Sequence, residues 1–204
     1  MPDSTQGSRT RPAPATRVDG AEADGVGSGT GPLKDLLAFH AEIRAALTAL
    51  LGFIADARRG VIDESDATFL ARFFSGPLLW HDEDEEVSVL RRLRHAPLSA
   101  AQLALVEATH RGHDKMETLL ESVVPVLEKL ARKRTDVSLT DLEQEARALR
   151  SLLEGHLTLE EQNLFPLAAQ VFTAEDLACV RKEIDARHGR SSPDATRSKR
   201  AVPL

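Results

Sequence analysis

Two segments of the chain repeat one arrangement of side chains that can hold a metal ion. Residues 81–86 read His-Asp-Glu-Asp-Glu-Glu and residues 156–161 read His-Leu-Thr-Leu-Glu-Glu, so in each a histidine is followed four residues later by two glutamates. Residues i and i+4 of a helix share a face, so each segment would aim an imidazole and a carboxylate at one point. One such spacing is common by chance in a chain with 28% charged residues, but its repetition predicts two metal-ligand pairs.

The elements that must position these pairs are amphipathic helices. Apolar residues recur at intervals of three and four, and the alternation by two that strands require is not sustained anywhere. Four long helices are expected at about residues 33–59, 65–95, 99–128 and 140–167, and a short fifth helix at about residues 174–187. Four comparable helices joined by short links predict an all-α, up-and-down four-helix bundle with a short C-terminal helix.

Capping residues and prolines indicate where these helices begin and end. The candidate caps are Asp63 or Ser65 for the second helix, Ser99 for the third, Ser138 or Thr140 for the fourth and Thr173 for the fifth. Pro77 is expected to kink the second helix, while Pro125 and Pro166 would bend or end the third and fourth.

The composition is that of an ordinary soluble protein. The 204 residues are 42% apolar with a net charge of −6, no run of about 18 apolar residues could cross a bilayer, and the N-terminus lacks the apolar segment of an export signal. We therefore expect a cytoplasmic protein that does not bind membranes. Cys179 has no second cysteine to pair with, and its apolar neighbours favour packing within a helix. The lack of tyrosine excludes a tyrosinate ligand and a tyrosyl radical.

The two ends of the chain have the composition of disordered segments. Residues 1–31 are rich in Pro, Gly, Ser and Thr and are expected to form a disordered arm. Residues 189–204 are similar but basic, and because no aromatic residues are interleaved we interpret them as a disordered tail that does not bind nucleic acid. The bundle domain is therefore expected at residues 32–188.

Five of the seven histidines occupy positions in the apolar stripes where leucine would be typical. They are His40, His81, His110, His113 and His156. A single histidine in such a stripe is more often an ordinary core residue than a ligand. Five of them, with Glu85 and Glu160, would bury a dense polar cluster at a high cost, unless a metal centre satisfies them all. The other two histidines, His95 and His188, are expected at the surface.

The ligand spacing narrows the kind of metal site. Ferritin-type di-iron proteins use Glu-x-x-His twice, and this chain has it once, at Glu107 and His110. The His-Glu-x-x-His signature of zinc proteases and the cysteine pairs of structural zinc sites are absent from the sequence. Histidines with a minority of carboxylates suit iron, manganese, zinc or copper by ligand type, and two carboxylates able to bridge favour a pair of metals.

The ordered set of candidate ligands resembles the haemerythrin-like HHE cation-binding family over about residues 33–170. The residues that carry the resemblance are His40, His81-x3-Glu85-Glu86, His113 and His156-x3-Glu160-Glu161-x3-Phe165-Pro166. The resemblance implies a four-helix bundle with a non-haem di-iron centre, often with an oxo or hydroxo bridge, that meets oxygen, peroxide or nitric oxide. It implies His40, His81, His113 and His156 as terminal ligands, and Glu85 and Glu160 as bridges.

Two departures from the family pattern bear on the chemistry. Family members often have a second histidine directly after the ligand of the second helix, where this chain has Asp82. The oxygen carriers have two histidines four apart on the third helix, whereas His110 and His113 are three apart, a spacing that still shares a face. With His110 as a ligand, two six-coordinate irons keep about one open position, which suits a diatomic molecule; without it about two stay open, which better suits redox turnover.

Three hypotheses for the function follow. The first is a di-iron protein that binds or responds to oxygen, peroxide or nitric oxide, with His110 as a fifth histidine ligand. The second is a di-iron oxidoreductase that disproportionates peroxide or oxidises an unidentified substrate with oxygen. The third is a binding module that uses its metal or redox state to control a partner protein through its tails. A structural bundle without metal is disfavoured by the cost of burying the polar cluster.

Overall fold

A computed structural model of the chain describes residues 31–189. The arm and the tail for which disorder is predicted lie almost wholly outside these described residues. The helices are α1 (Pro32–Arg58), α2 (Glu64–Ser75), α3 (Pro77–Asp84), α4 (Arg91–His95), α5 (Ala100–Ala131), α6 (Leu139–Leu159), α7 (Phe165–Val171) and α8 (Ala174–Arg187), with π-helical turns η1 (Glu85–Leu90) and η2 (Glu160–Leu164).

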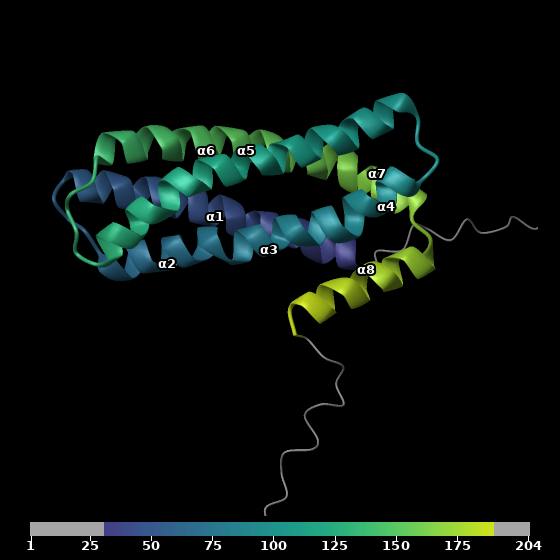
Figure 1. The fold of residues 1–204 in the computed structure, drawn as a ribbon, viewed down its shortest axis with the longest axis horizontal. Helices are drawn as coiled ribbons and strands as arrows, with labels where there is room; N and C mark the ends of the chain where they lie inside the picture. Colours follow the sequence, from purple (N-terminus) through teal and green to yellow (C-terminus); the bar gives the residue numbers. More distant parts are fainter. Residues whose placement is uncertain (1–30, 190–204) are drawn as a thin grey trace, which may run out of the picture.

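These elements form four antiparallel rods and one crossing helix (Figure 1). The first rod is α1, the second runs from α2 through α3 and η1 to α4, the third is α5, and the fourth runs from α6 through η2 to α7. Each rod packs against the next, α1 on α2, α2 on α5, α5 on α6, and α6 back on α1, while α8 contacts α1 and η1. The predicted up-and-down four-helix bundle with a short C-terminal helix is confirmed.

The helix starts follow the predicted caps. Asp63, Ser99, Ser138 and Thr173 each accept a hydrogen bond from a backbone N–H in the first turn of the helix that follows. These bonds satisfy N–H groups that the helix itself leaves free. The short C-terminal helix, α8, begins and ends where the sequence predicts it.

The three prolines inside the predicted helices have different effects. Pro77 begins α3 directly after a break at Gly76, so the second rod is divided there. Pro166 lies in the first turn of α7, directly after the π turn η2, and the fourth rod continues through it. Pro125 stays within α5, which continues to Ala131 without interruption.

Each copy of the His-x3-Glu-Glu repeat contains a π-helical turn that the sequence did not predict. η1 begins at Glu85 and η2 begins at Glu160, so the wider turn starts at the first glutamate in both copies. A π turn changes the angular position of the residues that follow it and is frequent at functional sites. The two consecutive glutamates of each copy point about 100° apart around the helix and reach different partners, as the metal centre shows below.

Two apolar clusters fill the interior, one on each side of the candidate ligands. The larger cluster includes Ile43 of α1 and Met116 of α5, and the smaller includes Leu36 of α1 and Val106 of α5. Burial of each such large side chain contributes about 1.5–3 kcal/mol. Because His40 of α1 and His113 of α5 fall between these residues, these two candidate ligands lie deep in the bundle.

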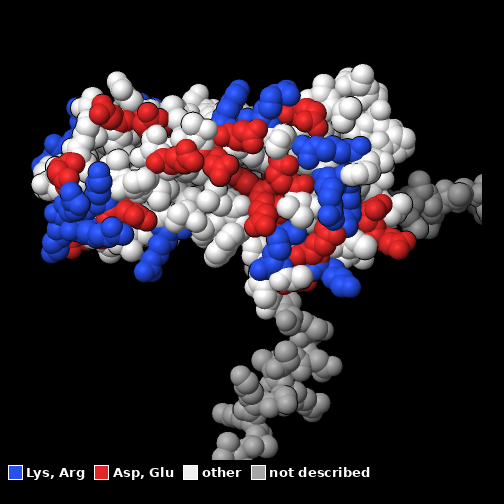
Figure 2. Space-filling view, viewed as in Figure 1, with Lys and Arg blue, Asp and Glu red and all other residues white. Residues whose placement is uncertain are grey.

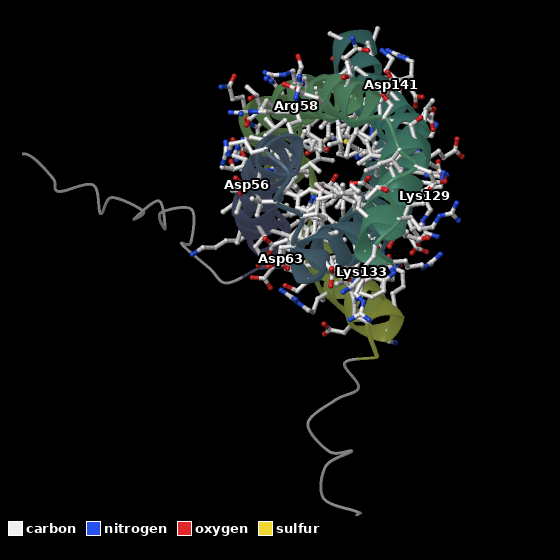
Figure 3. All side chains as sticks on the ribbon, turned by 90° about the vertical axis from the view of Figure 1, so that its left-hand side faces the viewer. Asp56, Arg58, Asp63, Lys129, Lys133 and Asp141 are labelled. Carbon is white, nitrogen blue, oxygen red and sulfur yellow. The ribbon has the colours of Figure 1, made fainter. Side chains whose placement is uncertain are left out.

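The outside of the bundle is charged. Seen from one end, the labelled residues Asp56, Arg58, Lys129, Lys133 and Asp141 surround a ring of helices filled with side chains (Figure 3). On the face shown in Figure 2, acidic side chains gather across the middle, with basic groups toward both ends. Charges of both signs thus cover the polar faces of the amphipathic helices.

The composition of α1 fits both a membrane-spanning helix and a core helix of a soluble protein. By length and apolar content alone it is the one described helix that could cross a membrane, a test that core helices of soluble proteins also pass. In this structure α1 packs against α2 and α6 and buries His40 together with apolar residues. These contacts are those of a core helix in a bundle.

One expectation about a single residue is wrong, because Cys179 is exposed on α8 and is not packed in the core. His188, expected at the surface, is partly exposed, and its Nε2 lies 2.7 Å from Oδ2 of Asp84, whose other oxygen accepts a 2.7 Å hydrogen bond from Arg187. Asp84 is buried, so these contacts fasten the end of α8 to α3.

Candidate metal centre

Six side chains from all four rods meet between the two apolar clusters. They are His40 from α1, His81 from α3, Glu85 from η1, His113 from α5, His156 from α6 and Glu160 from η2. None of them is more than 7% exposed. All six were predicted as ligands from the sequence, and the structure brings them together.

The six side chains form two groups that share both glutamates. His40 and His81 complete one group with Glu85 and Glu160, and His113 and His156 complete the other. Within each group the candidate ligand atoms lie within 4.8 Å of one another. Since bonds from an ion to imidazole nitrogen or carboxylate oxygen are about 2.0–2.2 Å long, each group has the width of one ion site. The arrangement fits two ions bridged by Glu85 and Glu160.

The atoms that face the centre have no hydrogen-bond partner among the described residues. They are eight in number, namely Nε2 of the four histidines and both carboxylate oxygens of Glu85 and Glu160. Even His156 Nε2, which lies 2.7 Å from a Glu160 oxygen, lacks the geometry of a hydrogen bond. Each unpaired buried polar group costs about 1–3 kcal/mol. Cations would satisfy all eight atoms at once, which is the chemistry this donor set fits.

The ionisation states of the cluster depend on one another. Burial lowers the pKa of His81, but the charge of Glu85, the contact with its carboxylate and the charges of Asp82 and Glu160 together outweigh this effect and raise the pKa to about 9. Burial also lowers the pKa of His113, and its contacts with Glu160 and Glu85 raise it to about 12. For Glu85, burial raises the pKa, but the charge of His81 and contacts with the other histidines hold it well below the usual value. A metal ion must therefore displace protons from His81 and His113 at neutral pH.

The sequence of the chain matches one known protein family. A family model described as Hemerythrin HHE cation binding domain matches residues 31–168, and it also matches residues 104–186. The first match covers more than half of the chain and all six side chains of the centre. The chain belongs to the haemerythrin HHE cation-binding family. No curated protein and no solved structure matches it.

The histidines of this haemerythrin domain are packed in pairs. His113 and His156 lie edge to face with ring centroids 4.6 Å apart, and His40 and His81 do the same at 5.2 Å. Each pair belongs to one of the two ligand groups. Phe39 covers His81 with its ring centroid 5.2 Å away, so an apolar wall restricts the movement of that imidazole.

His110 is the one predicted ligand that the structure does not bring to the haemerythrin centre. Its side chain is 41% exposed, and its Nδ1 lies 2.9 Å from Oε1 of Glu86 instead of facing the bridging glutamates. Three residues of α-helix turn through about 300°, so His110 lies about 60° around α5 from His113. Ligation by His110 stays a prediction that this geometry does not support.

Asp82 occupies the position where haemerythrin family members often have a histidine. Burial raises the pKa of Asp82 to about 6, a nearby positive charge on His113 opposes this, and Glu85 adds to it. The charges of the centre thus act on the Asp82 carboxyl, although Asp82 belongs to neither ligand group.

Sequence spacing alone assigns no role to the second glutamate of each copy. Glu86 and Glu161 nevertheless contact the imidazoles of His113 and His40, respectively. The signal that could have found them is the repeat itself, since both copies contain the second glutamate.

A cavity of about 460 Å³ between α1, α3 and α8 reaches the haemerythrin centre. His81 forms part of its wall, with Phe39, Trp80 and Ile184 among the apolar side chains that line it. Glu42, which is exposed, also borders the cavity. A small molecule could therefore reach one candidate ligand from the α8 side of the bundle.

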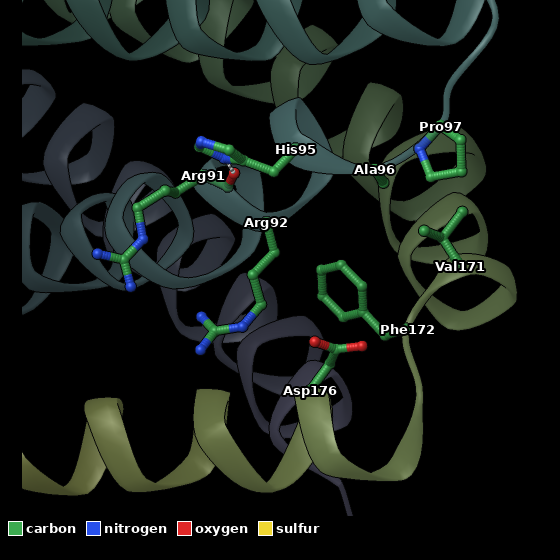
Figure 4. A pocket seen from close by; sticks show the side chains of 8 residues that line it. All are labelled: Arg91, Arg92, His95, Ala96, Pro97, Val171, Phe172 and Asp176. Carbon is green, nitrogen blue, oxygen red and sulfur yellow. Dashed lines mark hydrogen bonds between the residues drawn. The ribbon is translucent and has the colours of Figure 1, made fainter.

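A second cleft, of about 590 Å³, lies apart from the centre beside α4, α7 and α8 (Figure 4). Arg91, Arg92 and Phe172 line it, and none of the six ligands does. Both arginines are paired with Glu183, Arg92 through two hydrogen bonds of 2.8 Å. These side chains fix α8 to the second rod and contribute nothing to the centre.

Proposed function

We propose that this member of the haemerythrin family holds two iron ions and binds or responds to oxygen or a related small oxidant, peroxide or nitric oxide. The observation that carries the proposal is the set of eight buried, unpaired ligand atoms, arranged in two groups that share Glu85 and Glu160. Iron accepts a mixed set of imidazole nitrogen and carboxylate oxygen, and shared carboxylates suit a pair of ions.

A bound di-iron pair would supply electron transfer to or from a small oxidant. The protein would contribute the coordination and the surroundings. The four buried histidines would hold terminal positions and the two buried glutamates would bridge. The apolar clusters on both sides would exclude bulk water, while the cavity beside His81 would admit a small molecule.

The second candidate function is that of a di-iron oxidoreductase, which turns over peroxide or uses oxygen to oxidise another substrate. The placement of His110 favours it over reversible oxygen carriage. With four histidines, two bridging glutamates and an oxo or hydroxo bridge, each six-coordinate ion would keep about one position open, or about two in all. The hypothesis of a partner protein controlled through the tails concerns residues outside the described range and stays a prediction.

Anaerobic reconstitution of the full-length protein with ferrous iron tests the proposed function. We expect about two irons per chain and, after air is admitted, the near-ultraviolet bands of oxygen-bridged ferric iron. Glu85→Ala and Glu160→Ala should each reduce the iron content, because each removes a ligand shared by both groups. Glu117→Ala, at an exposed position of α5, is the matched control and should leave it unchanged. A wild-type protein that stays colourless and free of iron would contradict the proposal.

A steady-state peroxide assay on the iron-loaded protein distinguishes the two candidate functions. The oxidoreductase hypothesis predicts repeated consumption of peroxide by the wild type and none by Glu85→Ala. Stoichiometric reaction without turnover would count against peroxide as a substrate and would favour binding or sensing.

A further inference from the structure

Each copy of the repeat contains a second glutamate that does not face the metal centre. Glu86 and Glu161 lie inside the π turns, one residue after Glu85 and Glu160. Each contacts a histidine that comes from a different rod of the bundle. Oε1 of Glu86 lies 2.8 Å from Nδ1 of His113, and Oε1 of Glu161 lies 3.0 Å from Nδ1 of His40, both distances of a good hydrogen bond.

These contacts are made at Nδ1, the nitrogen of each imidazole ring that lies opposite the candidate ligand atom Nε2. A carboxylate can only accept, so Nδ1 of His40 and of His113 must be the donor. The opposite atom, Nε2, is then the one that points to the bridging glutamates, at 3.3 Å from Glu85 for His113 and 3.5 Å from Glu160 for His40. An imidazole that donates through Nδ1 presents the Nε2 lone pair that a metal ion needs.

An arginine stands behind each second glutamate. Nη1 of Arg44 lies 2.6 Å from Glu161, and Nη1 of Arg94 lies 3.5 Å from Glu86. Both arginines contact one further carboxylate through Nε, at 3.4 Å for Arg44 and 2.9 Å for Arg94; these carboxylates belong to Glu154 and Glu107. The same chain of arginine, glutamate and histidine thus occurs twice, once for each ligand group.

We propose that Glu86 and Glu161 are positioning residues that fix the tautomer and the orientation of His113 and His40, with Arg94 and Arg44 holding the two carboxylates in place. The inference rests on the proposed metal centre, but not on iron or on a reaction with oxygen. In the His-x3-Glu-Glu repeat, the histidine is then a terminal ligand and the first glutamate a bridging carboxylate. The second glutamate orients a histidine ligand that comes from another rod.

The two positioning residues serve different ions. His40 belongs to the group completed by His81, and His113 to the group completed by His156. Loss of Glu161 should therefore weaken one ion site and loss of Glu86 the other. A general folding defect would weaken both sites together, so the pattern of loss separates positioning from a merely structural role.

Cobalt(II) binding to the full-length protein tests the inference. Removal of a carboxylate that supports a ligating histidine typically costs about 10–100-fold in metal affinity. We expect Glu86→Ala and Glu161→Ala each to lower the affinity for one of the two cobalt ions by about that factor. In paramagnetic NMR spectra each variant should also lose the exchangeable Nδ1–H signal of a different imidazole. Glu86→Gln and Glu161→Gln keep an oxygen acceptor and should recover part of the affinity.

Glu183→Ala is the matched control. The Glu183 side chain is 29% exposed, between the 23% of Glu86 and the 30% of Glu161, and it is also paired with arginines. It contacts none of the six candidate ligands. We expect this variant to bind both cobalt ions like the wild type and to keep all imidazole N–H signals.

Each other outcome is decisive. If Glu86→Ala and Glu161→Ala keep wild-type cobalt affinity and both N–H signals, the positioning role is wrong. It is also wrong if each variant lowers the affinity for both cobalt ions equally. If the wild type binds two cobalt ions but its iron form does not react with any oxidant, the proposed function fails and the positioning role can still be judged. A wild type that binds no metal overturns both.

Discussion

Gly112 of α5 lies against the imidazole ring of His156 on α6. A Cβ atom added at Gly112 would come within 2.7 Å of Cε1 of His156 and closer still to Nδ1. No real side chain tolerates such an approach without movement, so the ring rests directly on the α5 backbone. This contact places His156 beside His113, its partner in one ligand group, and makes a glycine in the middle of α5 part of the centre.

Gly112→Ala should therefore weaken the binding of the ion held by His113 and His156, while Glu85 and Glu160 remain in place. We expect a loss of metal affinity of about 10-fold or more, comparable to that of other changes that disturb a ligating histidine. Gly155→Ala is the control in α6, where an added Cβ meets no atom within 4 Å. It should keep full affinity and stabilise the helix by about 0.5–1 kcal/mol in thermal or urea unfolding. Equal metal affinity in the two variants would refute the role of Gly112.

His110→Ala tests whether His110 is a fifth histidine ligand of the metal or lies outside the ligand set. If His110 is the fifth ligand, its loss should lower the iron content or alter the near-ultraviolet bands. The observed contact with Glu86 at 2.9 Å and the 41% exposure predict instead that His110→Ala still binds about two irons. His113→Ala is the matched control on the same helix and should lose iron from one site. Iron analysis of the three proteins side by side gives the answer.

The bundle and its six buried candidate ligands could be predicted because they depend on local spacing. Thr173 caps α8, and His81 shares a face with Glu85, whatever the rest of the chain does. The remaining features depend on which rods meet. The contact of Glu161 with His40 joins residues 121 positions apart, and the role of Gly112 exists only because α6 packs against α5. The π turns were likewise not predicted from the apolar periodicity, because each is only five or six residues long.

The stability of the metal-free protein should fall at both ends of the pH range. Burial raises the pKa of Glu86, but its contacts with His113 and His110 lower it to about 2, below the ordinary 4.5. The stabilisation from this group is thus complete above about pH 4.5 and lost as the pH falls toward 2. His81, whose pKa of about 9 lies above the ordinary 6.5, contributes below about pH 6.5 and loses its contribution as the pH rises through 9.

Urea unfolding of protein treated with a chelator, at pH values from about 3 to 10, measures this dependence. We expect the free energy of unfolding to be largest near about pH 4.5, because the raised pKa of Asp82, about 6 against an ordinary 3.8, already lowers stability as the pH rises toward 6. His81→Gln should reduce the alkaline decrease without abolishing it, because His113, whose pKa is raised to about 12, contributes a decrease of the same sign; the acid decrease should stay in place. Iron loading should also remove the alkaline decrease, because a ligating histidine is already neutral. A metal-free protein whose stability is constant from pH 6 to pH 10 would show that His81 is not protonated as inferred.

The cavity beside His81 predicts the route by which a small oxidant reaches the iron. Glu42 is exposed where it borders this cavity and contacts none of the six ligands, so Glu42→Trp should obstruct the opening without disturbing the centre. We expect unchanged iron content but a slower reaction of the ferrous protein with oxygen or peroxide in stopped-flow absorbance. Glu117→Trp, at an exposed position away from the cavity, should react like the wild type. Equal rates in all three proteins would mean that oxidants enter by another path, because blocking this opening with the added indole would not have slowed the reaction.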